Sequence, residues 1–212
     1  MMIITPPNFI VDANVYDKID IYAQIMNKVQ TVNVSVDQNF KDTFCQYYGL
    51  NGFTDLSFQN DFFDYMEKIK RNDPLPSYRD VMEQLWKQTG RVDYSFSSKL
   101  LHTLNPDSPI LDKHVLRLLG FERKDSGKPQ SRINYYSDVY ETVKAEYETV
   151  KAEYDQIANA LKNGCTSKIC NALRSLDSKY PEGRDLGLST ARKIDCLLFR
   201  LRNCRGISML TL

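Results

Sequence analysis

The stretch that decides the fold reads SSKLLHTLNPDSPILDKHV over residues 97–115. Its first part places Lys99 at the start of a short leucine-rich run, which predicts a helix that Ser97 or Ser98 caps and that ends before Pro106. Asp112 then precedes a second helical pattern, and aspartate is among the preferred N-cap residues. The pattern predicts a lysine and an aspartate at the N-termini of two abutting helices. Such a pair suits an amine nucleophile with a carboxylate partner, and it suits a structural ion pair equally well.

Outside this stretch the sequence predicts an all-α protein of about eight helices, the last of them in the tail from Ser189. Apolar and aromatic residues recur at helical spacing over most of the chain, and glycine is scarce. Ser77 and Gly90 are expected at the start and the end of one of these helices, and residues 121–131 are expected to form a loop. The exception is residues 31–36, TVNVSV, whose alternation at period two predicts a short extended segment. No linker-like composition divides the chain, so we expect residues 1–212 to form one globular unit. Two helical lobes with residues 97–115 between them would fit this pattern.

Residues 141–154 contain the heptad ETVKAEY twice in succession. The apolar residues of residues 140–161 then follow one another at steps of three and four, which predicts a single amphipathic helix. Two heptads can lengthen a helix by about two turns with little rotation of its apolar face. We favour this interpretation, and a monomer, over a homodimer formed through residues 140–161.

The composition excludes several classes of protein. No apolar run reaches the roughly 18 residues of a membrane span, and residues 1–7 lack the pattern of a signal peptide. Five cysteines at irregular spacing without a CxxC motif predict reduced thiols and a cytoplasmic protein. The two histidines form no metal-binding pattern, and there is no P-loop or GxGxxG. We therefore expect no metal, no nucleotide cofactor and no other cofactor.

The net charge of +1 conceals an asymmetry between the two ends of the chain. Residues 1–75 hold 6 Lys and Arg against 10 Asp and Glu, whereas residues 160–212 hold 10 against 4. A basic C-terminal quarter would suit contact with phosphates. A solvated helical surface is the plainer interpretation.

Lys99 is the residue best suited to carry chemistry. A position at the start of a helix and burial among leucines both disfavour a charged ammonium, so we expect its pKa to be lowered. A lysine with a lowered pKa has more free amine, which can attack carbon and form a Schiff base. Asp112 would then be its carboxylate partner, although an N-cap role explains this aspartate on its own.

Residues 97–115 resemble the catalytic stretch of the helix-hairpin-helix DNA glycosylase superfamily, in particular its 8-oxoguanine DNA glycosylase branch. Lys99 matches the lysine that begins the helix after the family's hairpin. Residues 110–115, ILDKHV, match an apolar-Asp-x-His-Val sequence that bears the catalytic aspartate, here Asp112. The similarity centres on residues 77–121.

The resemblance implies a helix-hairpin-helix glycosylase-like bundle and double-stranded DNA as partner. A damaged base, such as an oxidised purine, would be flipped out of the duplex. Lys99 would attack C1′ of its sugar, and strand cleavage of the abasic-site lyase type would follow the Schiff base. Asp112 would stabilise the cationic transition state. His102 and His114 are candidate accessory residues for proton transfer, and a buried, hydrogen-bonded histidine is the plainer interpretation of each. The candidate phosphate contacts are Arg91, Arg117, Arg123 and Lys124.

The chain departs from the family before Lys99. Residues 90–96, GRVDYSF, contain no Gly-x-Gly turn, and Asp93 carries the wrong charge for a phosphate cradle. The alternative function is therefore a non-catalytic helical binding module, in which Lys99 and Asp112 pair only to support the structure.

Overall fold

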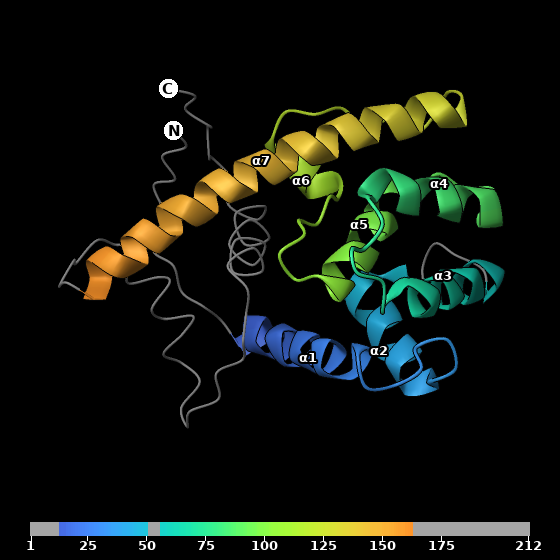
Figure 1. The fold of residues 1–212 in the computed structure, drawn as a ribbon, viewed down its shortest axis with the longest axis horizontal. Helices are drawn as coiled ribbons and strands as arrows, with labels where there is room; N and C mark the ends of the chain where they lie inside the picture. Colours follow the sequence, from blue (N-terminus) through green and yellow to red (C-terminus); the bar gives the residue numbers. More distant parts are fainter. Residues whose placement is uncertain (1–12, 51–55, 163–212) are drawn as a thin grey trace.

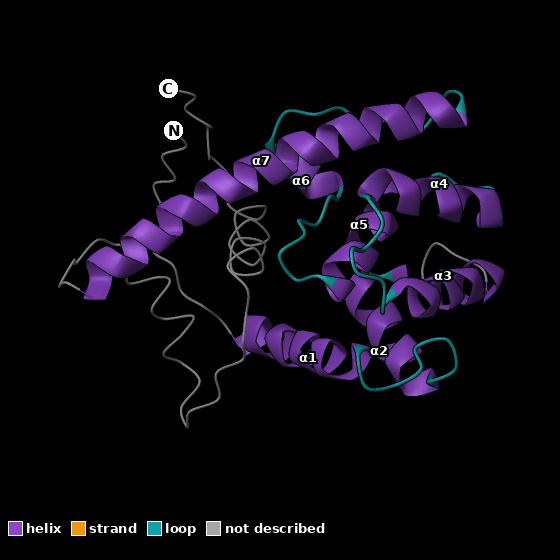
Figure 2. Ribbon diagram, viewed as in Figure 1, coloured by secondary structure: helices purple, strands orange, loops and turns teal. Residues whose placement is uncertain are grey.

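The computed structural model describes residues 13–50 and 56–162, and within these ranges it contains seven helices and no strand (Figure 2). The predicted all-α class is confirmed. The helix expected after Ser189 lies outside the described residues. The seven helices are α1 (Ala13–Val29), α2 (Gln38–Tyr48), α3 (Leu56–Ile69), α4 (Tyr78–Thr89), α5 (Tyr94–Leu104), α6 (Lys113–Leu118) and α7 (Pro129–Lys162).

The helices pack around one contiguous apolar core. Helix α1 contacts α2 and α5, while α4 contacts α3, α5 and α7 (Figure 1). Figure 1 shows α7 crossing one side of the molecule, with its C-terminal half extending past α6 and α5. The core is rich in aromatic side chains, so each helix buries a large apolar area at few positions. Its largest fully buried members include Phe40, Phe44, Phe62, Phe63, Leu100, Leu111 and Tyr136.

The predicted extended segment at residues 31–36 is wrong, because these residues form turns between α1 and α2. The side chain of Asn33 accepts hydrogen bonds from both the N–H and the hydroxyl of Ser35, at 3.0 and 2.8 Å. The N–H of Val34 donates to the Glu67 carboxylate on α3, at 2.8 Å. The Asn33 side chain and the Glu67 carboxylate thus accept from backbone N–H groups that, in a strand, would donate to a neighbouring strand.

Helices α4 and α5 contact each other and are joined by the four residues 90–93. Ser77 and Asp80 form a capping box at the start of α4, and Gly90 ends the helix with a left-handed φ of 70°. The N–H of Gly90 donates to the carbonyl of Trp86 at 2.8 Å. A residue with a side chain would be strained in this conformation, so glycine at this position fixes where the chain turns.

Helix α5 begins earlier than the sequence indicated. Ser97 and Ser98 were the expected N-caps, but Asp93 caps the helix by accepting a hydrogen bond from the N–H of Phe96 at 3.1 Å. The hydroxyl of Ser97 instead donates within the helix to the carbonyl of Asp93. Lys99 consequently lies in the second turn of α5, where the helix dipole has little effect on its charge.

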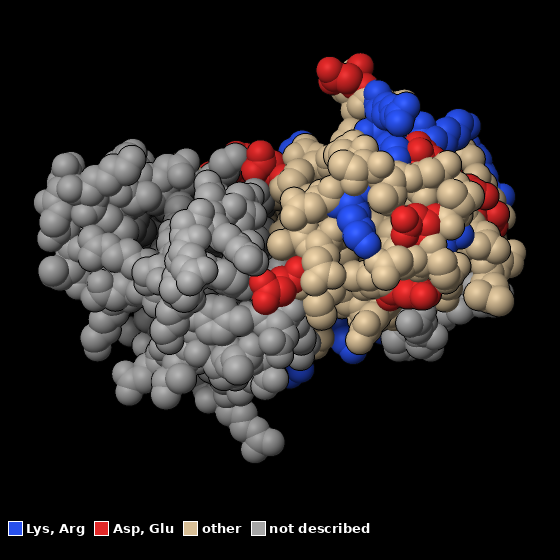
Figure 3. All heavy atoms as spheres, turned by 90° about the horizontal axis from the view of Figure 1, so that it is seen from below, with Lys and Arg blue, Asp and Glu red and all other residues tan. Residues whose placement is uncertain are grey.

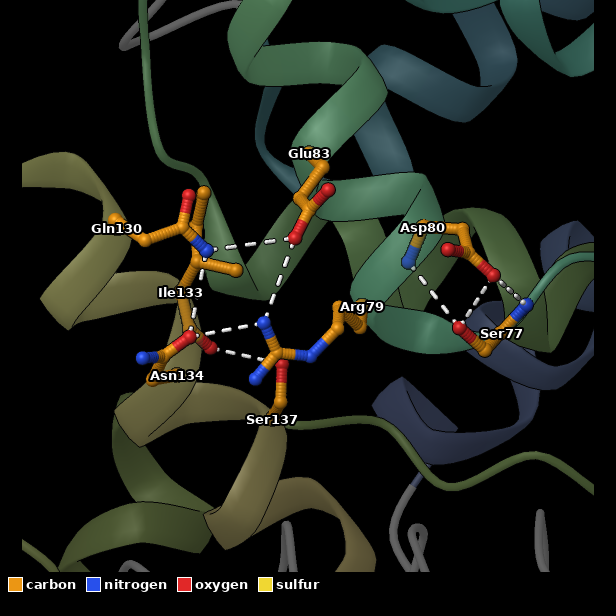
Figure 4. A network of polar contacts seen from close by, with 8 residues as sticks. All are labelled: Ser77, Arg79, Asp80, Glu83, Gln130, Ile133, Asn134 and Ser137. Carbon is orange, nitrogen blue, oxygen red and sulfur yellow. Dashed lines mark hydrogen bonds and ion pairs between the residues drawn. The ribbon is translucent and has the colours of Figure 1, made fainter.

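Stacked tyrosines and a polar network hold α7 against the rest of the bundle. Tyr78 stacks on Tyr140 with ring centroids 3.9 Å apart, and Tyr94 stacks on Tyr136 at 4.3 Å. A polar network, drawn in Figure 4, joins α4 to the first turns of α7. It contains the hydrogen bond from Arg79 to Asn134 (2.8 Å), the ion pair of Arg79 with Glu83, and the hydrogen bonds from Gln130 to Glu83 and Asn134.

The duplicated heptads lie in the middle of α7, in one uninterrupted helix as predicted. Val143 and Tyr147 are buried against the core, so the apolar stripe packs onto the bundle at least through the first heptad. The helix begins at Pro129, a favourable residue for a first helical position, although residues 121–131 were expected to be a loop.

Candidate active site

Lys99 projects from α5 toward the end of α2. Its ammonium donates a hydrogen bond to the carbonyl of Tyr48, the last residue of α2, at 3.2 Å. Its Nζ also lies 4.4 Å from the centroid of the Phe96 ring and 5.8 Å from that of Tyr48. The carbonyl end of a helix and two aromatic faces all favour a positive charge at this point. The side chain is half-buried, so its amine is shielded from bulk solvent.

The protonation of Lys99 reflects a competition between burial and nearby charges. Burial lowers its pKa most strongly, the carboxylates of Asp112 and Asp93 raise it, and Lys113 lowers it. Burial has the largest effect, so the pKa of Lys99 lies below the ordinary value for lysine. The sequence analysis predicted this direction. The cause is desolvation, with no contribution required from the start of a helix.

Asp112 is the N-cap of α6. One of its carboxylate oxygens, Oδ1, accepts hydrogen bonds from the N–H groups of His114 and Val115, at 2.8 and 2.9 Å. Among the described residues no ion pair joins Asp112 to Lys99, whose ammonium is bonded to Tyr48 instead. The two charges are nevertheless near enough for Asp112 to raise the pKa of the lysine. The arrangement is therefore a proximal pair without direct contact.

Two polar residues on one face of α5 hold the connector that leads to Asp112. Ser98 is fully buried, and its Oγ accepts a hydrogen bond from the N–H of Leu111 at 2.9 Å. One turn later, Nδ1 of His102 bonds to the carbonyl oxygen of Ser108 at 2.7 Å. A carbonyl can only accept, so Nδ1 carries the proton. In the neutral ring Nε2 then accepts from the Tyr22 hydroxyl, at 3.0 Å.

These contacts assign His102 to the support of the connector, since both of its ring nitrogens are engaged away from Lys99. It is the buried, hydrogen-bonded histidine of the plainer interpretation. His114 is half-buried in the first turn of α6, where its N–H bonds to Asp112. Ser98 was missed by sequence reasoning, which considered it only as a helix cap. Its four-residue spacing from His102 was the available signal.

At the turn between α4 and α5, the N–H groups of Arg91 and Phe96 already bond to side chains of the chain itself. The Asp93 carboxylate occupies the place of an external anion, because it caps the start of α5 from within the chain. Arg91 lies beside it, with its guanidinium 4.0 Å from the Asp93 carboxylate and 5.1 Å from the Phe58 ring centroid. Arg91 is exposed, so it could still reach a ligand at the surface.

The loop of residues 121–128 presents further basic side chains near the site. Tyr135 and Tyr136 of α7 bond to the backbone of this loop through their hydroxyls, at 2.7 to 3.0 Å. Arg132 donates both to the carbonyl of Lys124 and to the carbonyl of Val92, and so joins the loop to the hairpin. These five contacts fix the loop beside residues 90–93.

The basic residues of the loop already have local partners. Arg123 pairs with Asp125 at 2.6 Å, and Lys124 lies 4.0 Å above the ring of Tyr135. Arg117 is exposed in the last turn of α6. In Figure 3, basic side chains gather along one edge of the described part, and acidic ones are interspersed over the rest of this face. Exposed pairs of this kind are weak, so a phosphate could replace the partner.

The pKa of Tyr94 is affected both by a charge on the loop of residues 121–128 and by Asp112. Burial raises the pKa of its hydroxyl, as do Tyr136 and Asp112, whereas Arg123 lowers it. Charges from α6 and from the loop thus reach the same side chain. The structure brings Lys99, Asp112 and Arg123 into one region of the molecule.

Within residues 13–50 and 56–162, no three side chains of the His, Cys, Asp or Glu types are grouped so as to hold a metal ion. None of the helices described there combines the length and the apolarity needed to cross a bilayer. Comparison with known proteins gives no match, whether to a family model, to a curated protein or to a solved structure.

Proposed function

We propose that this protein is a DNA base-excision glycosylase with abasic-site lyase activity, and that Lys99 is its nucleophile. One observation carries the proposal: a half-buried amine whose pKa is lowered by burial lies within the electrostatic reach of a carboxylate held on a separate helix. Perturbed groups of this kind are concentrated at reactive sites. The α4–turn–α5 pair supports the helix-hairpin-helix assignment, because Lys99 lies on the helix that follows the turn.

The chemistry assigns a separate role to each group. The lone pair of the Lys99 amine attacks C1′ of the target nucleotide, the N–C1′ bond forms, and the glycosidic bond breaks. The base leaves with the bonding electrons and takes up a proton. The Asp112 carboxylate stabilises the positive charge that develops on the sugar, an electrostatic role that needs no direct bond to Lys99. Ring opening then gives a protonated Schiff base. Loss of a proton from C2′ forms a C2′–C3′ double bond, and the C3′–O bond breaks as the 3′ phosphate leaves with its electrons, which cleaves the strand.

The environment of Lys99 suits such a cation. Both the ammonium and the later iminium place positive charge at Nζ, beside the Tyr48 carbonyl and the Phe96 ring. The same groups would therefore stabilise the covalent intermediate after they have held the free lysine. The basic residues Arg91, Arg117, Arg123 and Lys124 would supply phosphate contacts in place of a Gly-x-Gly turn, which residues 90–96 lack.

A non-catalytic helical binding module is the second candidate, and the bond from Lys99 to Tyr48 favours it. A lysine that caps the last carbonyls of α2 stabilises that helix without any reaction. In this case the basic loop at residues 121–128 would bind a partner, and Lys99 would only support the fold.

Single-turnover assays on defined duplexes distinguish the two functions. The substrates are duplexes with one 8-oxoguanine or one abasic site, incubated with wild type, Lys99→Gln and Asp112→Asn. Asparagine caps helices as well as aspartate does, so Asp112→Asn should fold normally. The proposal predicts excision or nicking by wild type, none by Lys99→Gln, and a rate lowered by roughly 100-fold in Asp112→Asn.

DNA binding provides the second readout of this experiment. A glycosylase should bind the lesion duplex with an affinity that falls as salt rises, in all three proteins. Binding without any reaction on either duplex would instead support the binding module. If wild type neither reacts with nor binds either duplex, the glycosylase proposal is wrong.

A further inference from the structure

Two residues of α5, Ser98 and His102, form a clamp on the connector between α5 and α6. Both are fully buried and lie one turn apart on the same helical face. Ser98 accepts from the N–H of Leu111 at 2.9 Å, and its hydroxyl lies within hydrogen-bonding distance of the carbonyls of Ser95 (2.8 Å) and Leu111 (3.2 Å). The hydroxyl has one proton to donate and the Ser95 carbonyl is the nearer acceptor, so the contact that holds Leu111 is the one through its N–H.

The clamp adjoins both groups of the candidate site. Ser98 is the residue before Lys99, and Leu111 is the residue before Asp112. The hydrogen bond from the N–H of Leu111 to Ser98 therefore connects the segment that carries Lys99 to the segment that carries Asp112. His102 holds the connector at Ser108, four residues before Asp112. Two further constraints act on Asp112, namely the burial of the adjacent Leu111 in the core and its own cap on α6.

We infer that Ser98 is a positioning residue that sets the separation of Lys99 and Asp112. This inference rests on the proposed function for its catalytic consequence, whereas the positioning itself does not depend on DNA. When the hydroxyl of Ser98 is removed, the N–H of Leu111 loses its partner on α5. The connector keeps the buried Leu111 side chain and the bond to His102, so we expect a limited shift of Asp112 away from Lys99 while α5 stays folded.

Ser97 provides a matched control within the same turn. It is fully buried, as Ser98 is, but its hydroxyl donates to the carbonyl of Asp93 inside α5. Ser97→Ala therefore removes a buried hydroxyl without touching the connector. Ser98→Thr keeps the hydroxyl at position 98 and serves as the conservative variant. Thermal melts of all three variants establish that each is folded before the other readouts are compared.

The first readout is the pKa of Lys99, which needs no substrate. Lysines are dimethylated with ¹³C-formaldehyde, the ¹³C resonance of Lys99 is identified by its loss in Lys99→Arg, and its shift is followed with pH. Asp112 raises the pKa of Lys99, so its displacement should lower that pKa. We expect a lower value in Ser98→Ala than in wild type, and wild-type values in Ser97→Ala and Ser98→Thr.

The second readout is the single-turnover rate on duplex with an abasic site. Misplacement of a catalytic group by about 1 Å costs up to roughly 100-fold in rate. Ser98→Ala should therefore react roughly 10- to 100-fold more slowly than wild type with unchanged DNA affinity, whereas Ser97→Ala should react at nearly the wild-type rate.

The two readouts separate the failure of this inference from that of the proposed function. If wild type shows no reaction but Ser98→Ala lowers the pKa of Lys99, the glycosylase proposal fails and the positioning role stands. If Ser98→Ala matches Ser97→Ala in the pKa of Lys99, the positioning role is overturned, whatever the wild-type protein does with DNA.

Discussion

The surroundings of Lys99 contain one factor that disfavours its positive charge and several that favour it. Burial opposes the charge, while the Tyr48 carbonyl, the Phe96 ring and the nearby Asp112 compensate it in part. The balance leaves the pKa below the lysine value of 10.5. Two consequences follow for this residue: its amine is more available to an electrophile, and its charged form detracts from stability at neutral pH.

Stability should depend on pH through Lys99. Between its lowered folded-state pKa and 10.5, the unfolded chain binds more protons than the folded protein, so the free energy of unfolding rises with pH in this window. Below the window the burial penalty is fully present. Relative to Lys99→Met, wild type should therefore gain stability as pH rises from 7 toward the lysine value of 10.5.

Thermal melts across that pH range, compared for wild type and Lys99→Met, measure the effect. Lys87→Met, at an exposed position on α4 that is not among the charges acting on Lys99, is the control. A difference in melting temperature between wild type and Lys99→Met that stays constant with pH would contradict the lowered pKa of Lys99.

The thiol of Cys45 should be inert in the folded protein. It lies in α2 and is buried, and burial, with a smaller effect from Asp42, raises its pKa to about 11. Nearly all of it is therefore protonated at neutral pH, and the thiolate is the reactive form. Iodoacetamide labelling followed by peptide mass spectrometry should modify Cys45 only after denaturation. Labelling in native buffer at the rate of an unfolded control would show that the burial is incorrect.

At the scale of the elements, Asp93 combines a structural benefit with a functional cost. It caps α5, yet it places a negative charge where a phosphate would otherwise approach the helix start. Asp93→Asn should keep the cap, with stability within about 0.5 kcal/mol of wild type, whereas Asp93→Ala should lose about 1 kcal/mol. Urea unfolding measures both values.

The same pair of variants tests the DNA contact. Removal of the carboxylate charge should tighten duplex binding by Asp93→Asn at low salt, because one repulsion on the phosphate backbone is lost. Weaker or unchanged binding, with the fold intact, would show that the hairpin does not face DNA.

Local capping signals explain which elements the sequence could predict. Ser77, Gly90 and Asp112 each lie at the helix boundary expected of them, because their effect depends only on neighbouring residues. The turns at residues 31–36 could not be foreseen, since one of their backbone contacts comes from Glu67, 33 positions away from Val34.

The candidate site shows the same limit. The sequence predicted a partly buried Lys99 with a lowered pKa and Asp112 as a helix cap. The hydrogen-bond partner of Lys99 is the Tyr48 carbonyl, 51 positions earlier, which only the packing of α2 against α5 can bring near. The start of α5 was predicted too late, because Ser97 and Ser98 are also of a residue type that commonly caps helices, whereas Asp93 is the cap in the fold.

At the scale of the whole molecule, α7 is fastened by its first half. The stacked pairs Tyr78–Tyr140 and Tyr94–Tyr136 and the network of Figure 4 all precede the second heptad. The last buried residue of the helix among those described is Tyr147, at the end of the first heptad. The second copy of ETVKAEY therefore extends a helix that is already anchored.

Deletion of residues 148–154 should leave the fold intact. Seven residues are close to two helical turns, so the following residues keep nearly the same face. We expect a melting temperature within about 4 °C of wild type, equivalent to less than about 1 kcal/mol, and a monomeric mass by light scattering for both proteins. A dimer that dissociates upon this deletion would favour the homodimer through residues 140–161.

The covalent chemistry of Lys99 is the central claim, and borohydride trapping tests it most directly. Wild type and Lys99→Gln are incubated with a duplex carrying one abasic site, and borohydride reduces any Schiff base to a stable secondary amine. We predict a protein–DNA adduct with wild type, mapped by mass spectrometry to Lys99, and none with Lys99→Gln. Absence of an adduct with wild type, or an equal adduct with Lys99→Gln, would contradict the account.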